Sequence, residues 1–127
     1  ENFDNPNAMV VTSLINRAIK DNELTMIGDG SQVRDFINAG DVARGMIEAV
    51  NLMPEFPVNL CTGEGVTIKT LIKTIARHAN IIVKQVPLEN QVVGAQSRVM
   101  KLNWNFKPLI DLEDGLKETI DYARTNK

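Results

Sequence analysis

The sequence predicts an α/β fold, because segments with helical periodicity alternate with short runs rich in β-branched residues. The length of 127 residues is that of one domain. The predicted strands are few, so the chain supplies little of a complete doubly wound sheet. With 43% hydrophobic and 24% charged residues, the composition is that of an ordinary globular domain.

Helix signals are clearest where a capping residue precedes an apolar stripe. Thr67 and Asp111 are good N-cap residues, and Asp21-Asn22 ends the first helical pattern. In the second pattern, the apolar face includes Met46 and Val50. The predicted helices cover residues near 11–19, 40–50, 68–78, 98–102 and 112–123.

Strand signals occupy the segments between these helices. The expected strands cover residues 24–27, 58–62 and 81–86, and residues 33–37 are expected to form a partner strand or an extended arm. Gly28-Asp29-Gly30 follows the first of them and indicates a tight turn. It does not fit a dinucleotide fingerprint, because Val33 stands at the third glycine position and a strand, not a helix, follows.

Charge and cysteine content restrict the partners. A net charge of −2 without a basic block argues against nucleic acid, and no apolar run reaches the roughly 20 residues of a membrane span. The single cysteine, Cys61, excludes an internal disulfide and fits a reducing compartment, so we expect a cytoplasmic location. The first residue is Glu1 and not Met, from which we expect a fragment or a processed product.

The isolated reactive side chains indicate structural roles. His78 lies near the end of a predicted helix, where capping or a surface contact is expected. Cys61 lies in an apolar run and is expected to be buried, and Trp104 is expected to anchor packing. One histidine and one cysteine do not supply a zinc site of the usual type, so no metal is expected.

Arg34 is the strongest candidate for ligand binding. It follows the glycine turn directly and precedes Asp35-Phe36. A guanidinium carries five donors in a rigid fork that suits a phosphate group. An ion pair of Arg34 with Asp35 or with Asp41 is an equally good interpretation of the spacing alone.

The ordered motifs resemble the carboxyl-terminal part of the extended short-chain dehydrogenase/reductase family, the NAD-dependent nucleotide-sugar epimerases and dehydratases. The family shows a "GDG-x-x-x-RDF" segment, a helix beginning "D-x-A", an "N-x-G-x-G" turn, and a "GW-x-P-x-x-x-L-x-x-G-L" block. The matching positions are Gly28, Asp29, Gly30, Arg34, Asp35, Phe36, Asp41, Ala43, Asn59, Gly63, Trp104, Pro108, Leu112, Gly115 and Leu116.

This resemblance implies that residues 1–127 are the nucleotide-sugar-binding portion of a larger enzyme, lacking most of the Rossmann sheet. In the family, an amino-terminal Rossmann domain holds NAD or NADP and the catalytic Tyr-x-x-x-Lys. This chain has no G-x-x-G-x-x-G, and Asn126 stands where the lysine after Tyr122 would be. We therefore expect no catalytic or cofactor-binding residue in this chain, which would be inactive alone. The missing half should pack on residues 58–62 and on the apolar faces of the second and third helices, and a homo-oligomer is expected.

The resemblance also assigns substrate-binding positions. Arg34 matches the arginine that pairs with the substrate diphosphate. The strand at Thr25, Met26 and Ile27 edges the nucleotide base. Further positions beside the nucleotide are Ala8, Met9 and Asn59, with Arg98 the nearest candidate for a second phosphate-binding arginine.

The chain departs from the family pattern at several positions. Residues 87–97 lack the usual second arginine, Asn38 replaces an aromatic residue, and Asn103 precedes Trp104 where glycine is usual. Two alternatives therefore stay open: a non-catalytic nucleotide-sugar-binding or scaffold relative, and a family reductase that acts on a non-sugar substrate.

Overall fold

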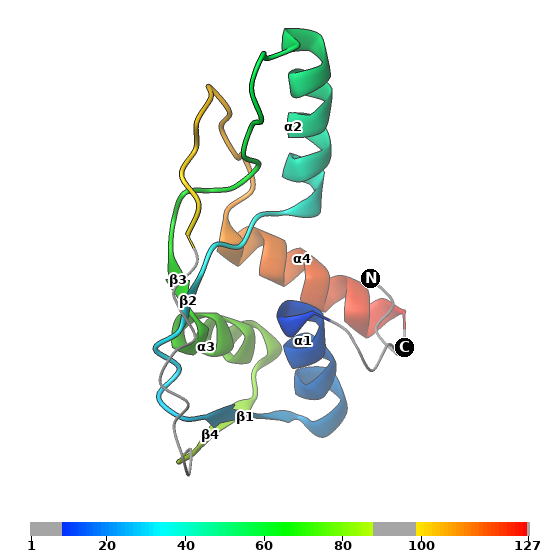
Figure 1. The fold of residues 1–127 in the computed structure, drawn as a ribbon. Helices are drawn as coiled ribbons and strands as arrows, with labels where there is room; N and C mark the ends of the chain where they lie inside the picture. Colours follow the sequence, from blue (N-terminus) through cyan, green and yellow to red (C-terminus); the bar gives the residue numbers. More distant parts are fainter. Residues whose placement is uncertain (1–8, 88–98, 127) are drawn as a thin grey trace.

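The computed structural model describes residues 9–87 and 99–126, and it has the predicted α/β fold (Figure 1). The predicted N-caps are confirmed, since Thr67 Oγ1 accepts a hydrogen bond from Thr70 N at 3.0 Å and Asp111 Oδ1 accepts one from Asp114 N at 2.8 Å. In chain order the elements are α1 (Val10–Asp21), β1 (Glu23–Ile27), β2 (Val33–Arg34), α2 (Ala39–Leu52), β3 (Val66–Thr67), α3 (Ile68–Ala79), β4 (Ile82–Val86) and α4 (Leu112–Thr125).

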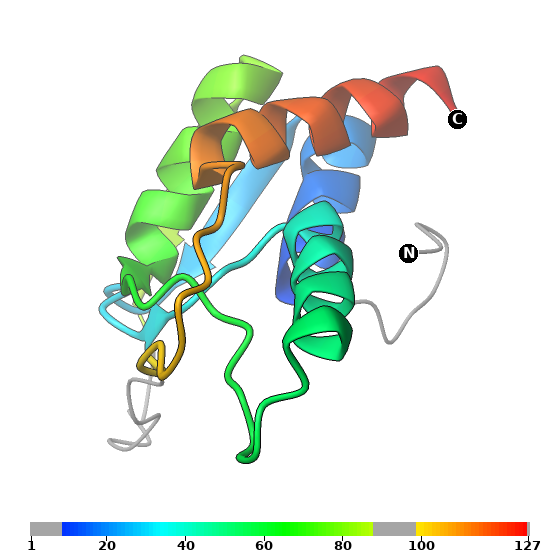
Figure 2. The ribbon, with the colours of Figure 1, turned by 90° about the horizontal axis from the view of Figure 1, so that it is seen from above.

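The core lies between the β1–β4 pair and the helices α1, α3 and α4, which Figure 2 shows from above. Its largest fully buried aliphatic side chains are at most 1% exposed: Ile15, Leu24, Leu71, Ile75 and Ile120. Burial of one such side chain contributes roughly 1.5–3 kcal/mol. The apolar stripes that predicted α1, α3 and α4 therefore all face one common core.

The strands β1 and β4 pair in parallel, from Glu23 opposite Ile82 to Ile27 opposite Val86. Successive side chains of a strand point to opposite faces of a sheet. The side chains of Leu24 and Met26 are accordingly buried, whereas Thr25 and Ile27 are exposed. Ile27 is 63% exposed, so the second face of this sheet is open.

The strands β2 and β3 form an antiparallel ladder of two residue pairs, Val33 with Thr67 and Arg34 with Val66. The strand predicted over 33–37 is thus confirmed only for its first two residues. The predicted glycine turn before it is confirmed, because Gly28 and Gly30 have φ values of 78° and 67°. A Cβ atom on Gly30 would lie 2.9 Å from Lys69 N, which leaves no room for another residue.

Two predicted elements are absent where the structure describes their residues. The strand predicted over 58–62 is wrong: this segment has no strand neighbour in the described chain. The helix predicted over 98–102 is also wrong for residues 99–102, which are irregular, while Arg98 lies outside the described residues. Side chains join the two segments instead: Asn59 Nδ2 donates to Lys101 O at 2.8 Å, and Cys61 Sγ lies 3.7 Å from Met100 O. The carbonyl oxygens of Met100 and Lys101 thus accept from side chains of another segment and not from N–H groups of a helix.

The helix α2 extends away from the other helices (Figure 1). Its predicted apolar face is largely exposed, with Met46 at 57%, Ile47 at 65% and Val50 at 73%. The apolar face of α3 is instead buried in the core of this chain, so the expectation that it packs on a separate half is wrong. An exposed apolar face of this kind typically marks an interface.

We expect the purified chain to self-associate through the exposed face of α2. The double variant Ile47→Lys, Val50→Lys should sediment as a monomer, because charged side chains on that face oppose burial. Its free energy of unfolding should stay within about 0.5 kcal/mol of the wild type, as for other surface changes. The variant Ile82→Lys is the matched control, because Ile82 is 71% exposed but lies on the open sheet face. Sedimentation velocity measures the result, and a wild-type chain that stays monomeric at high concentration contradicts it.

Candidate functional site

Arg34 is half-buried at the end of β2, just after the glycine turn. Its Nη1 atom donates a hydrogen bond to the carbonyl oxygen of Val33 at 2.8 Å. Its backbone pairs with Val66 of β3. The guanidinium is therefore held close to a backbone that is itself fixed by a ladder.

Asp41 has a different partner from the one that the spacing offered. Its side chain is 2% exposed and pairs with Arg44 at 2.9 Å. It also accepts hydrogen bonds from Leu109 N at 3.0 Å and Ile110 N at 2.9 Å. Burial of the Asp41 carboxyl raises its pKa, but the bonds from Ile110, Arg44 and Leu109 outweigh burial, and its pKa is lowered overall.

Asp35 binds the turn before β3. Its Oδ1 atom accepts from Thr62 N at 3.1 Å and from Thr62 Oγ1, and its Oδ2 atom accepts from Gly63 N at 2.9 Å. Neither Asp35 nor Asp41 depends on Arg34 for a partner. Arg44 was not among the predicted partners of Asp41, although a position three residues later is a usual spacing for an ion pair on a helix.

The predicted base-binding strand offers alternate side chains to the open face. Thr25 and Ile27 lie on that face, where Thr25 stands opposite Lys84 of β4. Met26 is 5% exposed, and its side chain belongs to the core. Met26 can therefore meet a ligand on the open face with its backbone but not with its side chain.

The remaining predicted positions differ in what surrounds them. Met9 is 70% exposed at the N-cap of α1. Asn59 joins its own loop to the segment around Trp104 by hydrogen bonds. Its backbone carbonyl oxygen accepts from Trp104 Nε1 at 2.8 Å, and its backbone N–H donates to Asn103 Oδ1 at 2.9 Å. Ala8 and Arg98 lie outside the described residues.

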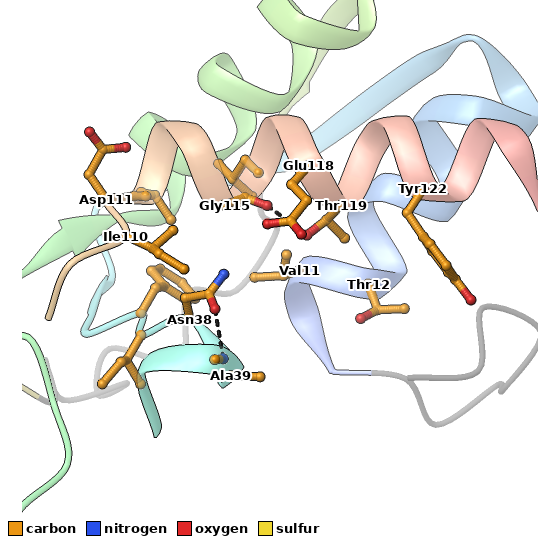
Figure 3. Close-up of a pocket in the computed structure, with 15 residues that line it drawn as sticks. Val11, Thr12, Asn38, Ala39, Ile110, Asp111, Gly115, Glu118, Thr119 and Tyr122 are labelled. Atoms are coloured by element: carbon orange, nitrogen blue, oxygen red, sulfur yellow. Dashed lines mark hydrogen bonds between the residues drawn. The ribbon is translucent and has the colours of Figure 1, made fainter. Parts of the chain in front are cut away.

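A separate cavity of about 660 Å³ lies between α1, α4 and the segment 36–40 (Figure 3). Asn38 and Ile110 lie toward one end of it, and Thr12 and Tyr122 toward the other. None of the six predicted substrate-binding residues that the structure describes lines this cavity. Sequence reasoning missed it, because its walls come from three segments whose approach no local pattern indicates.

The isolated reactive side chains have structural surroundings. The structure places His78 in the last turn of α3, with Nε2 3.3 Å from Glu113 Oε1 at the start of α4. Cys61 is 4% exposed, as expected, and burial raises the pKa of its thiol. Trp104 stacks on Phe106 with ring centroids 5.3 Å apart. Within the described ranges, no three His, Cys, Asp or Glu residues gather to hold a metal ion.

Comparison with known proteins identifies the class to which this fold belongs. Residues 1–59 match the model of the NAD dependent epimerase/dehydratase family. UDP-glucuronic acid decarboxylase 1 of Danio rerio is 32% identical over 118 residues, which are 89% of this chain and 28% of that protein. The crystal structure of a UDP-glucose 4-epimerase with UDP-glucose, from Thermotoga maritima, is 27% identical with a TM-score of 0.75, over 93% of this chain and 40% of that one.

The chain is similar to members of this family, the extended short-chain dehydrogenases/reductases, as the sequence motifs predict. It spans between 28% and 45% of the length of the curated relatives that it matches. Those relatives include nucleotide-sugar epimerases, decarboxylases and reductases. A UDP-glucose 4-epimerase of Thermus thermophilus, solved as a complex with NAD, has the same fold. It is 23% identical with a TM-score of 0.76, over 93% of this chain and 40% of that one.

A lipid bilayer could not be crossed by any helix in the described part of the chain, because none is both long and apolar enough.

Replacement of Asp41 by asparagine should destabilise the chain by about 2–3 kcal/mol at pH 7, because an amide replaces a buried charged acceptor of several bonds. The lowered pKa of Asp41 means that its stabilising effect is complete above the ordinary carboxyl pKa of 3.8 and is lost as pH falls through the folded-state pKa. The difference in free energy of unfolding between wild type and Asp41→Asn should therefore shrink as the pH falls below 3.8. Urea unfolding at several pH values measures it, with Asp111→Asn as control, since asparagine is an equally good N-cap. A constant difference down to pH 2 contradicts this account.

Proposed function

We propose that residues 1–127 form the nucleotide-sugar-binding portion of an NAD(P)-dependent epimerase or dehydratase, and that Arg34 binds the diphosphate of the substrate. The observation that supports this most directly is the position of Arg34. It stands on the β2–β3 ladder, one glycine turn away from the strand that offers Thr25 and Ile27 on an open face.

The chemistry of Arg34 fits a diphosphate. The bond from Nη1 to the Val33 carbonyl fixes one edge of the guanidinium, and the planar group has several more donors. Arginine binds phosphate through paired parallel hydrogen bonds, which give geometric specificity as well as energy. A half-buried position strengthens such bonds, because less water competes for the donors.

The open face of the β1–β4 sheet fits a nucleotide base. Ile27 offers an apolar side chain for the flat surface of the base, and the Thr25 hydroxyl can donate or accept a hydrogen bond at its edge. We include the Met26 backbone, Met9, Asn59, Ala8 and Arg98 in the proposed site. In this proposal the side chain of Met26 supports the strand from the core and does not touch the ligand.

The Gly28-Asp29-Gly30 turn does not fit a dinucleotide cofactor. A strand and not a helix follows the Gly28-Asp29-Gly30 turn, so no helix N-terminus is available there for a pyrophosphate. We therefore propose that NAD or NADP is held by a Rossmann half outside this chain. That half would cover the apolar face of α2 in a cytoplasmic, homo-oligomeric enzyme.

The variant Arg34→Lys should weaken nucleoside diphosphate binding roughly ten- to a hundredfold in the complete gene product that carries this chain. Lysine keeps the charge but loses the paired donors, and one charge-assisted bond is worth about 1.5–3 kcal/mol. NAD affinity should barely change. Calorimetric titration with UDP, dTDP, GDP and CDP measures the effect.

Arg77→Lys is the matched control for this titration, because the Arg77 pair with Glu113 is largely exposed and remote in sequence from the proposed site. Equal diphosphate affinity in wild type and Arg34→Lys would leave Arg34 a structural role. Failure of the wild type to bind any of the four diphosphates would overturn the proposed function as a whole.

The purified 127-residue chain should show no turnover with any nucleotide sugar and NAD, because it lacks both the dinucleotide loop and the Tyr-x-x-x-Lys pair. Absorbance at the wavelength of reduced NAD, together with chromatography of the sugar products, measures this. Formation of an epimer or of reduced NAD by the chain alone would disprove the proposed division of the enzyme.

A further inference from the structure

We infer that Asp35 is a positioning residue for Arg34: its carboxylate fixes the end of the β2–β3 ladder, and through that ladder it fixes the guanidinium that binds phosphate. This inference rests on the proposed function. It adds a residue for which the sequence comparison gave no role other than a possible ion pair with Arg34.

The ladder that carries Arg34 is too short to hold its own register. It has two residue pairs, and an isolated pair of strands is marginally stable even when longer. On the side toward the glycine turn, backbone hydrogen bonds support it: Ile68 N donates to Gln32 O and Lys69 N donates to Gly30 O, both at 2.9 Å. Those bonds anchor the chain before Arg34 to the first turn of α3.

On the other side of Arg34 the support comes from Asp35. Its two carboxylate oxygens accept from Thr62 N, Thr62 Oγ1 and Gly63 N. Gly63 has a φ of 77°, a backbone conformation that other residues rarely adopt. The Thr62 hydroxyl also accepts a hydrogen bond from Glu64 N at 3.1 Å, so the Thr62 side chain links Asp35 to the backbone of the turn. Arg34 therefore lies between a backbone anchor and a carboxylate anchor.

The carboxylate anchor requires two acceptor oxygens. In Asp35→Asn, one oxygen could still accept from Thr62, but the amide NH₂ would face the N–H of Gly63, and two donors would oppose each other. The end of the ladder would then shift, and Arg34 would shift with it. A misplacement of about 1 Å can cost an enzyme about two orders of magnitude in rate, and a displaced guanidinium should likewise bind phosphate less tightly.

The proposed base-binding strand does not depend on this anchor. Thr25 and Ile27 belong to β1, which has five pairs with β4 and buries Leu24 in the core. Loss of Asp35 should consequently weaken contacts to the phosphates and leave contacts to the base intact. A merely structural role would weaken both alike.

The test compares a nucleoside with its diphosphate in the complete gene product, using whichever of UDP, dTDP, GDP and CDP binds the wild type most tightly. Asp35→Asn should weaken diphosphate binding about tenfold, as expected for loss of one charge-assisted bond, and leave nucleoside binding unchanged. Asp35→Asn should add no further loss in an Arg34→Ala background, because its effect acts through Arg34. The milder variant Thr62→Val, which removes one of the three bonds, should give a smaller loss in the same direction.

Asp41→Asn is the matched control, because it replaces another carboxylate that binds backbone N–H groups but lies on α2. It should leave both affinities unchanged in the folded protein. Equal loss of nucleoside and diphosphate binding in Asp35→Asn, or full additivity with Arg34→Ala, would overturn the inference. If Arg34→Ala itself leaves diphosphate affinity unchanged, the proposed phosphate-binding role of Arg34 fails, and if the wild type binds none of the four diphosphates, the proposed function fails. Both results are distinct from failure of the role of Asp35 alone.

Discussion

Burial of one face of the β1–β4 pair is the constraint on which the rest of the structure depends. A parallel pair of five-residue strands is not stable by itself, so it must be covered by helices. The helices α1, α3 and α4 supply that cover (Figure 2). Because side chains alternate along a strand, burial of Leu24 and Met26 places Thr25 and Ile27 on the other face. The same packing that stabilises the chain thus creates the surface that we propose for the nucleotide base.

Outside that core, side chains bonded to backbone groups take the place of regular structure. Asp41 binds the segment before α4, Asp35 binds the turn before β3, and Asn59 binds a carbonyl of the 99–104 segment. A buried backbone group without a partner costs free energy, so irregular segments need such bonds. These contacts account for acidic and amide residues that a motif search alone would assign to chemistry.

The parts of the fold that could be predicted are those set by local pattern. The stripe that includes Leu71 and Ile75, with Thr67 as its cap, identified α3 because helical spacing and capping act within a few residues. The segment 58–62 has a strand-like composition, yet it forms no strand, since composition cannot show whether a neighbouring strand is present. The partners of Asp41 at Leu109 and Ile110 are equally hidden, because they are 68 and 69 residues away. For the candidate site, the motif selected Arg34 and the open strand, but only the structure separates Thr25 and Ile27 from the buried Met26.

The dense group of glycine, aspartate and arginine residues between 25 and 45 now divides into separate tasks. Glycine permits the positive φ values of the turn, and two aspartates accept hydrogen bonds from remote backbone N–H groups. Arg44 balances the charge of Asp41 inside α2 and also lies 5.0 Å from the centre of the Phe106 ring. Both acids therefore have hydrogen-bond partners of their own in other segments of the chain. The Arg34 guanidinium is half-buried, its Nη1 atom donates to the carbonyl oxygen of Val33, and we propose that it binds a ligand that carries negative charge.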